Sequence, residues 1–190
     1  MRAFIAIELS QEIKDSLSQL QERLKSSQAD VKWVSPQNIH LTLKFLGEVD
    51  ESKLEKIGEI LETLKADKTP FYMRLSSVGA FPKTNYPRVI WAGIDKGDTE
   101  TKEIAKFLEE KIAKLGIPAE DRPFSSHITI GRVKSGLNRE GLVKKLNESV
   151  NHFAKANLEF QVEKITLFKS TLTPKGPVYE ILKEVSLTTT

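Results

Sequence analysis

The stretch Ile39-His40-Leu41-Thr42-Leu43 occurs a second time as Ser126-His127-Ile128-Thr129-Ile130. Both copies share a histidine, an apolar residue, a threonine and a second apolar residue. Successive side chains of a β-strand point to opposite faces, so the histidine and threonine of each copy share one face of a strand. The two stretches therefore predict two strands that each present an imidazole beside a hydroxyl.

Two imidazoles and two hydroxyls suit the cleavage of a phosphodiester without a metal ion. One neutral imidazole can take a proton from an attacking water while a second, protonated imidazole gives a proton to the leaving oxygen. Histidine can do both because its unperturbed pKa is about 6.5. The hydroxyls would donate hydrogen bonds to the non-bridging phosphate oxygens. The motif thus predicts His40 and His127 as catalytic residues, with Thr42 and Thr129 binding the phosphate.

The two copies occupy corresponding places in the chain. Residues 4–7, a predicted first strand, precede His40 by about as much chain as residues 89–92 precede His127. This equal offset indicates an internal duplication, which would bring the two motif strands into one cleft about a pseudo-twofold axis. The third histidine, His152, has neither the motif nor a partner, and we interpret it as a surface or capping residue.

Length and composition predict either one compact domain or two small lobes that share a cleft. The chain has 190 residues, 39% of them apolar, and no cysteine, which excludes a disulfide framework and a cysteine-based metal site. Its net charge of +3 favours an anionic substrate if the excess is focused in a cleft. The N-terminal residues lack the apolar run of a signal peptide, and no segment is long enough to span a bilayer. We therefore expect a soluble, cytoplasmic protein that does not bind membranes.

Apolar periodicity predicts alternating strands and helices, and hence an α+β fold. Two largely antiparallel sheets are expected to face a central cleft, with helices on their outer faces and the histidine strands central. Leu41, Leu43 and Phe45 are expected to pack beneath the helices. Residues 81–88, rich in turn formers, are the predicted seam between two lobes of a single domain spanning 1–190. The predicted helices cover residues 10–24, 53–66, 99–115 and 138–150; the predicted strands cover 2–8, 31–34, 40–47, 71–80, 89–94, 158–168 and 178–187, together with the second motif strand.

The two motif stretches resemble the signatures of the two-histidine (2H) phosphoesterases. More narrowly, residues 33–47 and 122–132 resemble the RNA 2′,3′-cyclic phosphodiesterases, the LigT-type or 2′-5′ RNA ligase proteins, and the similarity runs nearly from end to end. One departure is Ser126, where the family often has proline. The resemblance implies a bilobal fold and hydrolysis of RNA 2′,3′-cyclic phosphate ends to 2′-phosphates, with neither a metal nor another cofactor. His40 would then be the general acid and His127 the general base.

Arg132 matches an arginine of the family, which implies a substrate-binding role, and its guanidinium can hold a phosphate by paired hydrogen bonds. Strand alternation would point Arg132 away from His127, but a bulge at Gly131 would turn it back. Lys44 shares the face of His40 and is a second candidate phosphate ligand. A substrate nucleotide also needs a stacking surface, for which the loop aromatics are candidates: Phe81, Tyr86 and Phe124. Trp33 is expected in the core.

Several alternatives stay open at the level of sequence. The same groups could run in reverse as an RNA ligase that forms 2′-5′ linkages between tRNA halves, or act on a small 2′,5′-linked or cyclic phosphate substrate. A non-catalytic module that binds RNA ends is an alternative of another class. A zinc site is disfavoured because zinc normally takes a third protein ligand. RNA ends with a 2′,3′-cyclic phosphate, and among them tRNA halves, are the expected partners of a monomeric protein.

Overall fold

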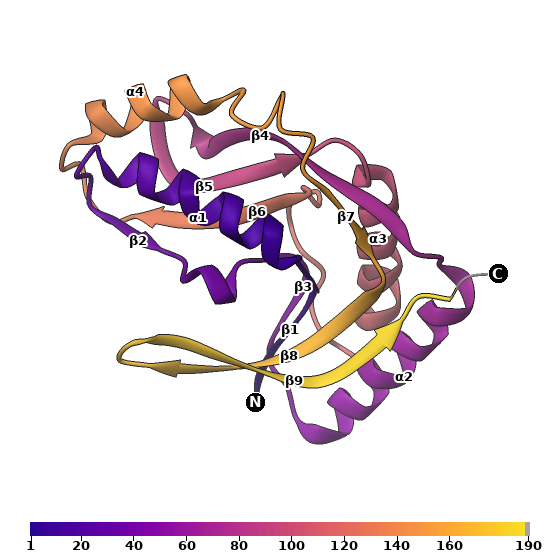
Figure 1. Ribbon diagram of the computed structural model, residues 1–190. Helices are drawn as coiled ribbons and strands as arrows, with labels where there is room; N and C mark the ends of the chain where they lie inside the picture. Colours follow the sequence, from indigo (N-terminus) through magenta and orange to yellow (C-terminus); the bar gives the residue numbers. More distant parts are fainter. Residues whose placement is uncertain (189–190) are drawn as a thin grey trace.

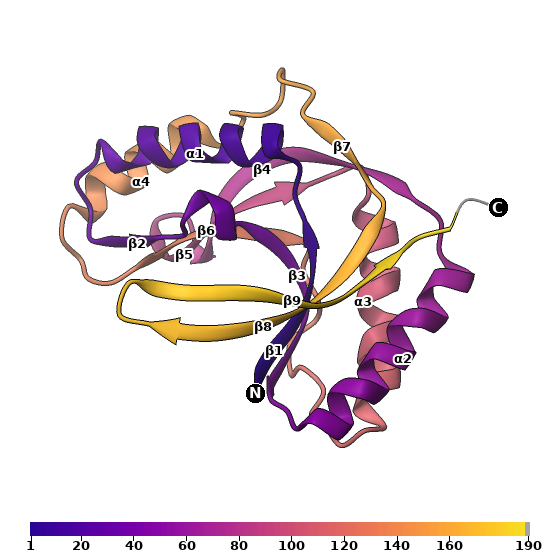
Figure 2. The same cartoon turned by 60° about the horizontal axis from the view of Figure 1, so that its bottom comes forward.

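Two antiparallel β-sheets form the framework of the computed structural model, which describes residues 1–188 (Figures 1 and 2). The four-stranded sheet has the order β3-β1-β8-β9, and the five-stranded sheet has the order β2-β6-β5-β4-β7. The strands are β1 (Arg2–Glu8), β2 (Val31–Trp33), β3 (His40–Glu48), β4 (Phe71–Lys83), β5 (Tyr86–Ile94), β6 (His127–Val133), β7 (Glu159–Val162), β8 (Lys164–Thr173) and β9 (Gly176–Ser186). The helices are α1 (Gln11–Lys25), the 3₁₀ helix η1 (Pro36–Asn38), α2 (Glu51–Asp67), α3 (Asp98–Ala113) and α4 (Arg139–Ser149).

The helices cover the sheets in two pairs, as both views show (Figures 1 and 2). Helices α1 and α4 lie side by side over the five-stranded sheet, whereas α2 and α3 lie together against the four-stranded sheet. Gln21 of α1 is buried and its side-chain amide donates to the Ile130 carbonyl of β6 at 2.9 Å. This bond fixes α1 on the back of the strand that begins with His127.

Local signals set the starts of the first two helices. The Ser10 hydroxyl accepts from the Ile13 amide, and the Asp50 carboxylate accepts from the Lys53 amide, so each caps an otherwise unpaired N–H group. The apolar residues that recur at helical spacing along α1 are fully buried, as their spacing predicted: Ile13, Leu17, Leu20 and Leu24. The predicted α+β fold with helices outside two antiparallel sheets is confirmed.

The predicted strand over residues 158–168 is wrong in one respect, because the chain changes sheets within it. β7 pairs with β4 in the five-stranded sheet, and after Glu163 the chain continues as β8, which pairs with β1 in the other sheet. The hairpin predicted through residues 173–176 is present, and the Thr173 hydroxyl donates to the Gly176 carbonyl at its tip. Sequence periodicity shows an extended chain but not which neighbour it pairs with.

Residues 81–88, the predicted seam, contain the end of β4, the turn at residues 84–85 and the start of β5, inside the five-stranded sheet. They therefore do not separate the two sheets in space. From the first half, β2 and β4 lie in the five-stranded sheet with β5, β6 and β7, and from the second half β8 and β9 lie in the four-stranded sheet with β1 and β3. Each sheet thus contains strands from both halves of the chain, and the two halves are interlocked.

Candidate active site

His40 begins β3 directly after η1 and is held on three sides. Its Nδ1 lies 2.6 Å from the Asn38 carbonyl, its Nε2 lies 2.9 Å from the Thr42 hydroxyl, and its ring stacks on Phe4 at 4.8 Å. A carbonyl can only accept, so Nδ1 donates to it and Nε2 is left to exchange protons. The edge of Tyr179 packs against the ring at 5.5 Å.

His127 begins β6 in an equivalent arrangement. Its Nδ1 lies 2.9 Å from the Ser125 carbonyl, two residues before it, as the Nδ1 of His40 bonds two residues before its own position. Nε2 of His127 is therefore also the ring nitrogen left to exchange protons. Phe81 of β4 packs at right angles to the ring with centroids 5.1 Å apart. The two motif strands, β3 and β6, are also in contact with each other across the sheets.

Both motif strands carry a bulge at the same place. In β3 the pairing steps from Thr42–Ala6 to Lys44–Ile5, and in β6 it steps from Thr129–Trp91 to Gly131–Ile90. One residue is skipped in each strand, Leu43 in the first and Ile130 in the second. This matched irregularity supports the internal duplication, because a bulge is specific to one position of a pairing.

The first bulge makes two predictions wrong. Phe45, expected under the helices, is 57% exposed, whereas Lys44, expected on the face of His40, is buried. The Lys44 ammonium donates to the Glu109 carboxylate at 3.0 Å and to the Pro118 carbonyl at 3.1 Å. The extra residue reverses the alternation beyond Leu43, so Lys44 points inward and cannot bind a phosphate on the other face.

The second bulge turns Arg132 as predicted. Gly131 is buried against Trp33 and Val31, and Arg132 is exposed. Burial is the largest influence on two nearby groups: it lowers the pKa of His127 and raises the pKa of Tyr179, the residue packed against His40. The positive charge of Arg132 acts in the lowering direction on the pKa of both groups. The charge of Arg132, in the five-stranded sheet, therefore acts on His127 and on Tyr179 of the four-stranded sheet, which packs against His40.

Burial lowers the pKa of both motif histidines below the ordinary value. For His40, burial is the largest cause, the bond to the Asn38 carbonyl opposes it, and the charge of Lys14 lowers the pKa further. For His127, burial is again the largest cause, opposed by the bond to the Ser125 carbonyl. Both imidazoles are thus kept neutral more readily than a solvated imidazole.

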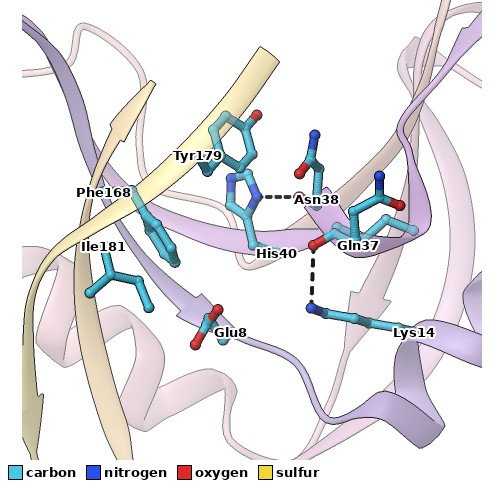
Figure 3. A pocket seen from close by; sticks show the side chains of 9 residues that line it. Glu8, Lys14, Gln37, Asn38, His40, Phe168, Tyr179 and Ile181 are labelled. Atoms are coloured by element: carbon cyan, nitrogen blue, oxygen red, sulfur yellow. Dashed lines mark hydrogen bonds between the residues drawn. The ribbon is translucent and has the colours of Figure 1, made fainter. Parts of the chain in front are cut away.

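A cavity of about 250 Å³ adjoins His40 (Figure 3). Three segments of the chain supply its walls: the end of β1 with the start of α1, the η1 turn with the start of β3, and the β8–β9 hairpin. Its lining residues are Glu8, Lys14, Gln37, Asn38, Ile39, His40, Phe168, Tyr179 and Ile181. Figure 3 shows Phe168 and Ile181 on the opposite side of the cavity from Gln37 and Lys14.

The aromatic residues beside His40 were not found from the sequence. Phe4, Phe168 and Tyr179 form a cluster of their own with Ala6 on the face that carries His40. They come from three different strands, and only long-range pairing brings them together. The one available signal was the aromatic residue Phe4 in the first strand, which alternates with Ala6 and so faces the same side.

The three aromatic residues predicted as stacking candidates lie in different places. Phe81 lies beside His127, whereas the ring of Tyr86 lies 4.3 Å from the Arg139 guanidinium. Phe124 packs against the main core, as does Trp33, whose core position was predicted. Within residues 1–188, no group of three or more His, Cys, Asp or Glu side chains is placed to hold a metal ion. No helix in this part of the chain is long and apolar enough to cross a membrane.

Sequence comparison assigns the family. The family described as LigT like Phosphoesterase matches two stretches of similar length, residues 7–91 and 94–179, and each stretch contains one His-x-Thr motif. The chain belongs to the LigT-like phosphoesterase family. A protein of Methanocaldococcus jannaschii named RNA 2′,3′-cyclic phosphodiesterase is 40% identical, and the alignment covers 97% of this chain and 99% of that protein. A protein of Aquifex aeolicus with the same name is 35% identical, with 98% and 97% covered.

Solved structures of similar proteins share the fold. A protein of Thermus thermophilus superposes with a TM-score of 0.80 at 31% identity, and the match covers 98% of each chain. Escherichia coli LigT in complex with 3′-AMP superposes with a TM-score of 0.82 at 26% identity, covering 99% of this chain and 98% of LigT. The family resemblance seen in the sequence is confirmed, and the chain is an enzyme of the phosphoesterase class.

Proposed function

We propose that this LigT-like phosphoesterase hydrolyses RNA 2′,3′-cyclic phosphate ends to 2′-phosphates without a metal ion. The observation that carries the proposal is a matched pair of half-sites, each consisting of one His-x-Thr strand. The two strands are in contact, and in each the Nδ1 of the histidine donates to a carbonyl two residues earlier. The names of the relatives support the substrate class. An imidazole pair provides both proton transfers that this hydrolysis needs.

In the proposed reaction, His127 is the general base and His40 the general acid. Nε2 of His127 takes a proton from a water whose oxygen attacks the phosphorus. The bond from phosphorus to the 3′ oxygen breaks, and Nε2 of His40 gives that oxygen its proton. The 2′ oxygen keeps the phosphate. His127 ends the step protonated and His40 ends it neutral, and proton exchange with solvent restores both.

The phosphate itself is bound by Thr42, Thr129 and Arg132 in this proposal. The Thr42 hydroxyl lies 2.9 Å from Nε2 of His40, so both atoms can reach one phosphate group. The charge of Arg132 acts on His127, and its guanidinium can pair with the non-bridging oxygens, where the negative charge resides. The negative charge of the phosphate also raises the pKa of a nearby imidazole, which keeps His40 protonated in the complex.

One chain supplies both half-sites, so we also propose that the protein acts as a monomer. RNA as the substrate, with tRNA halves among the candidates, suits a cytoplasmic enzyme. No step assigned above requires a metal ion, and a chelator is expected to leave the rate unchanged. A dependence on added metal would contradict the assigned roles.

The test is turnover of an oligonucleotide that ends in a 2′,3′-cyclic phosphate. His40→Ala and His127→Ala are each expected to lower kcat by at least about 100-fold, because each removes one proton transfer. His152→Ala is the matched control, since His152 lies in the turns after α4 and packs on Phe153, and it is expected to keep full activity. A 2′-phosphate product supports the proposal. A 3′-phosphate, or a joined 2′-5′ product in the presence of tRNA halves, would refute the assigned bond cleavage or direction.

A further inference from the structure

The positive charge of the chain is concentrated in three short segments. Residues 30–32, 83–88 and 132–140 contain six of the 29 Lys and Arg residues but two of the 26 Asp and Glu residues. The rest of the chain therefore holds 23 cations against 24 anions and is nearly neutral. The six cations are Lys32, Lys83, Arg88, Arg132, Lys134 and Arg139.

These segments meet at one end of the five-stranded sheet. Lys32 of β2 pairs with Arg132 of β6, and Arg132 is opposite Val89 of β5 on its other side. The Arg139 guanidinium lies over the ring of Tyr86, which joins the start of α4 to the β4–β5 turn. In Figure 1 the start of β2 and the end of β6 lie together on the left of the molecule.

Lys32 and Arg132 point away from the core, on the face that carries the active site. A Cβ on Gly131 would lie 2.9 Å from both Trp33 and Val31, so the neighbours of Lys32 fill the inner side of the sheet. Lys32 lies between them in an extended strand and therefore faces the other side. Arg132 is its cross-strand partner and is exposed, so the two cations are side by side.

Adjacent like charges on paired strands are unfavourable unless an anion offsets them. In the described part of the chain, none of the six cations forms a salt bridge with an Asp or Glu side chain. The nearby acids are Asp30, whose carbonyl accepts from the Lys134 amide, and Glu140. The excess of unpaired cations beside the phosphate-binding Arg132 indicates a polyanionic ligand.

We propose that Lys32, Lys134 and Arg139 form a track that binds the phosphodiester backbone of RNA on the 5′ side of the cyclic end. This inference rests on the proposed function and extends it from the reacting nucleotide to the strand that precedes it. The track would contact phosphates, so it raises the affinity for longer RNA strands whatever their base sequence. The enzyme is then expected to prefer an oligonucleotide over a cyclic mononucleotide.

The test compares kcat/KM for a decanucleotide with a 2′,3′-cyclic end and for 2′,3′-cyclic AMP. In the double variant Lys32→Gln, Lys134→Gln, the ratio of the two values is expected to fall by about 10-fold or more at low salt. The slope of log affinity against log salt for the decanucleotide should shrink by about 0.7 for each lysine–phosphate pair that the variant removes. Lys106→Gln, an exposed lysine of α3 on the other sheet, is the matched control and should change neither value.

A binding measurement tests the track independently of catalysis. A fluorescent decanucleotide with a 2′-phosphate end is titrated with the unaltered protein and the same variants. Weaker binding by the double variant than by Lys106→Gln supports the track even if no hydrolysis is found. Equal affinities and equal length preference in the double variant and the control would overturn it, while hydrolysis of the cyclic mononucleotide would still support the proposed function.

Discussion

Arg132 occupies in β6 the position that Phe45 occupies in β3. Each is five residues after its motif histidine, each follows the bulge of its strand, and each is exposed. Phe45 packs near Phe4 beside His40, with ring centroids 6.5 Å apart, whereas the charge of Arg132 acts on His127. The two half-sites therefore share a backbone but differ in chemistry, one being aromatic and the other cationic.

Replacing Arg132 tests the cationic half-site. Arg132→Met is expected to lower kcat/KM about 10- to 100-fold, because a charge-assisted hydrogen bond to phosphate contributes about 1.5–3 kcal/mol. Arg132→Lys should recover part of the loss, since it restores the charge without the paired geometry. Phe45→Met, at the equivalent position, is the control and should change kcat/KM less than Arg132→Met. Equal losses in the two methionine variants would contradict a phosphate-binding role for Arg132.

The pH dependence follows from burial of both histidines. A general base works above its pKa and a general acid works below its pKa, and both pKa values lie below the ordinary value in the free enzyme. The profile of kcat/KM is therefore expected to be a bell centred below about pH 6.5. Bound phosphate raises both pKa values, so the profile of kcat should lie at higher pH. A kcat/KM maximum well above neutrality would contradict this reasoning.

Lys14 offers a way to shift one limb of that bell. Its charge adds to burial in lowering the pKa of His40, so Lys14→Met should raise that pKa and move one limb of the kcat/KM profile to higher pH. Arg23→Met is the control, because the charge of Arg23 adds to burial in lowering the pKa of His152, which has no assigned role. The limb that moves identifies the step served by His40. If neither limb moves, or Arg23→Met moves one equally, His40 does not control the profile.

Lys44 and Glu109 test the correction at the first bulge. Glu109→Leu leaves the buried Lys44 ammonium without its carboxylate and is expected to destabilise the protein by about 3 kcal/mol. Lys44→Met should cost less, about 1 kcal/mol, because Glu109 is 29% exposed and can be hydrated. Urea unfolding measures both values. The reverse order would show that the ammonium is not held as a buried charge.

Gly131 tests the second bulge. Gly131→Ala is expected to cost about 1–3 kcal/mol, since the new methyl would lie 2.9 Å from Val31 and from Trp33. Val31→Ala in the same protein removes one of the two clashes and should recover part of the stability and of kcat/KM. Urea unfolding and turnover check the pair together. A stable, fully active Gly131→Ala protein would mean that the close packing here does not orient Arg132.

The sequence predicted features that depend on neighbours in the chain. The His and Thr of each motif are partly buried on one face while Leu41, Leu43, Ile128 and Ile130 are buried on the other, as alternation required. The capped, periodic helices were also predictable. The bulge in β6 could also be predicted, because a glycine such as Gly131 inside a strand is typical of a β-bulge.

The remaining features depend on long-range pairing. The pairing of β1 with β8, the change of sheet at Glu163, and the meeting of Phe4 with Tyr179 follow from strand order, which periodicity does not encode. Lys44 was misplaced because its bulge carries no glycine, and its partners Glu109 and Pro118 lie on the far side of the sheet. Nothing in the sequence around Lys44 indicated that its charged side chain would be buried.

The most direct measurement is a crystal structure of the protein with a bound 2′-phosphate product such as adenosine 2′-monophosphate. The phosphate is expected between the two motif strands, with Nε2 of His40 and Nε2 of His127 each about 3 Å from one of its oxygens. A phosphate held by one histidine alone, or bound outside the space between β3 and β6, would contradict the proposed two-histidine mechanism.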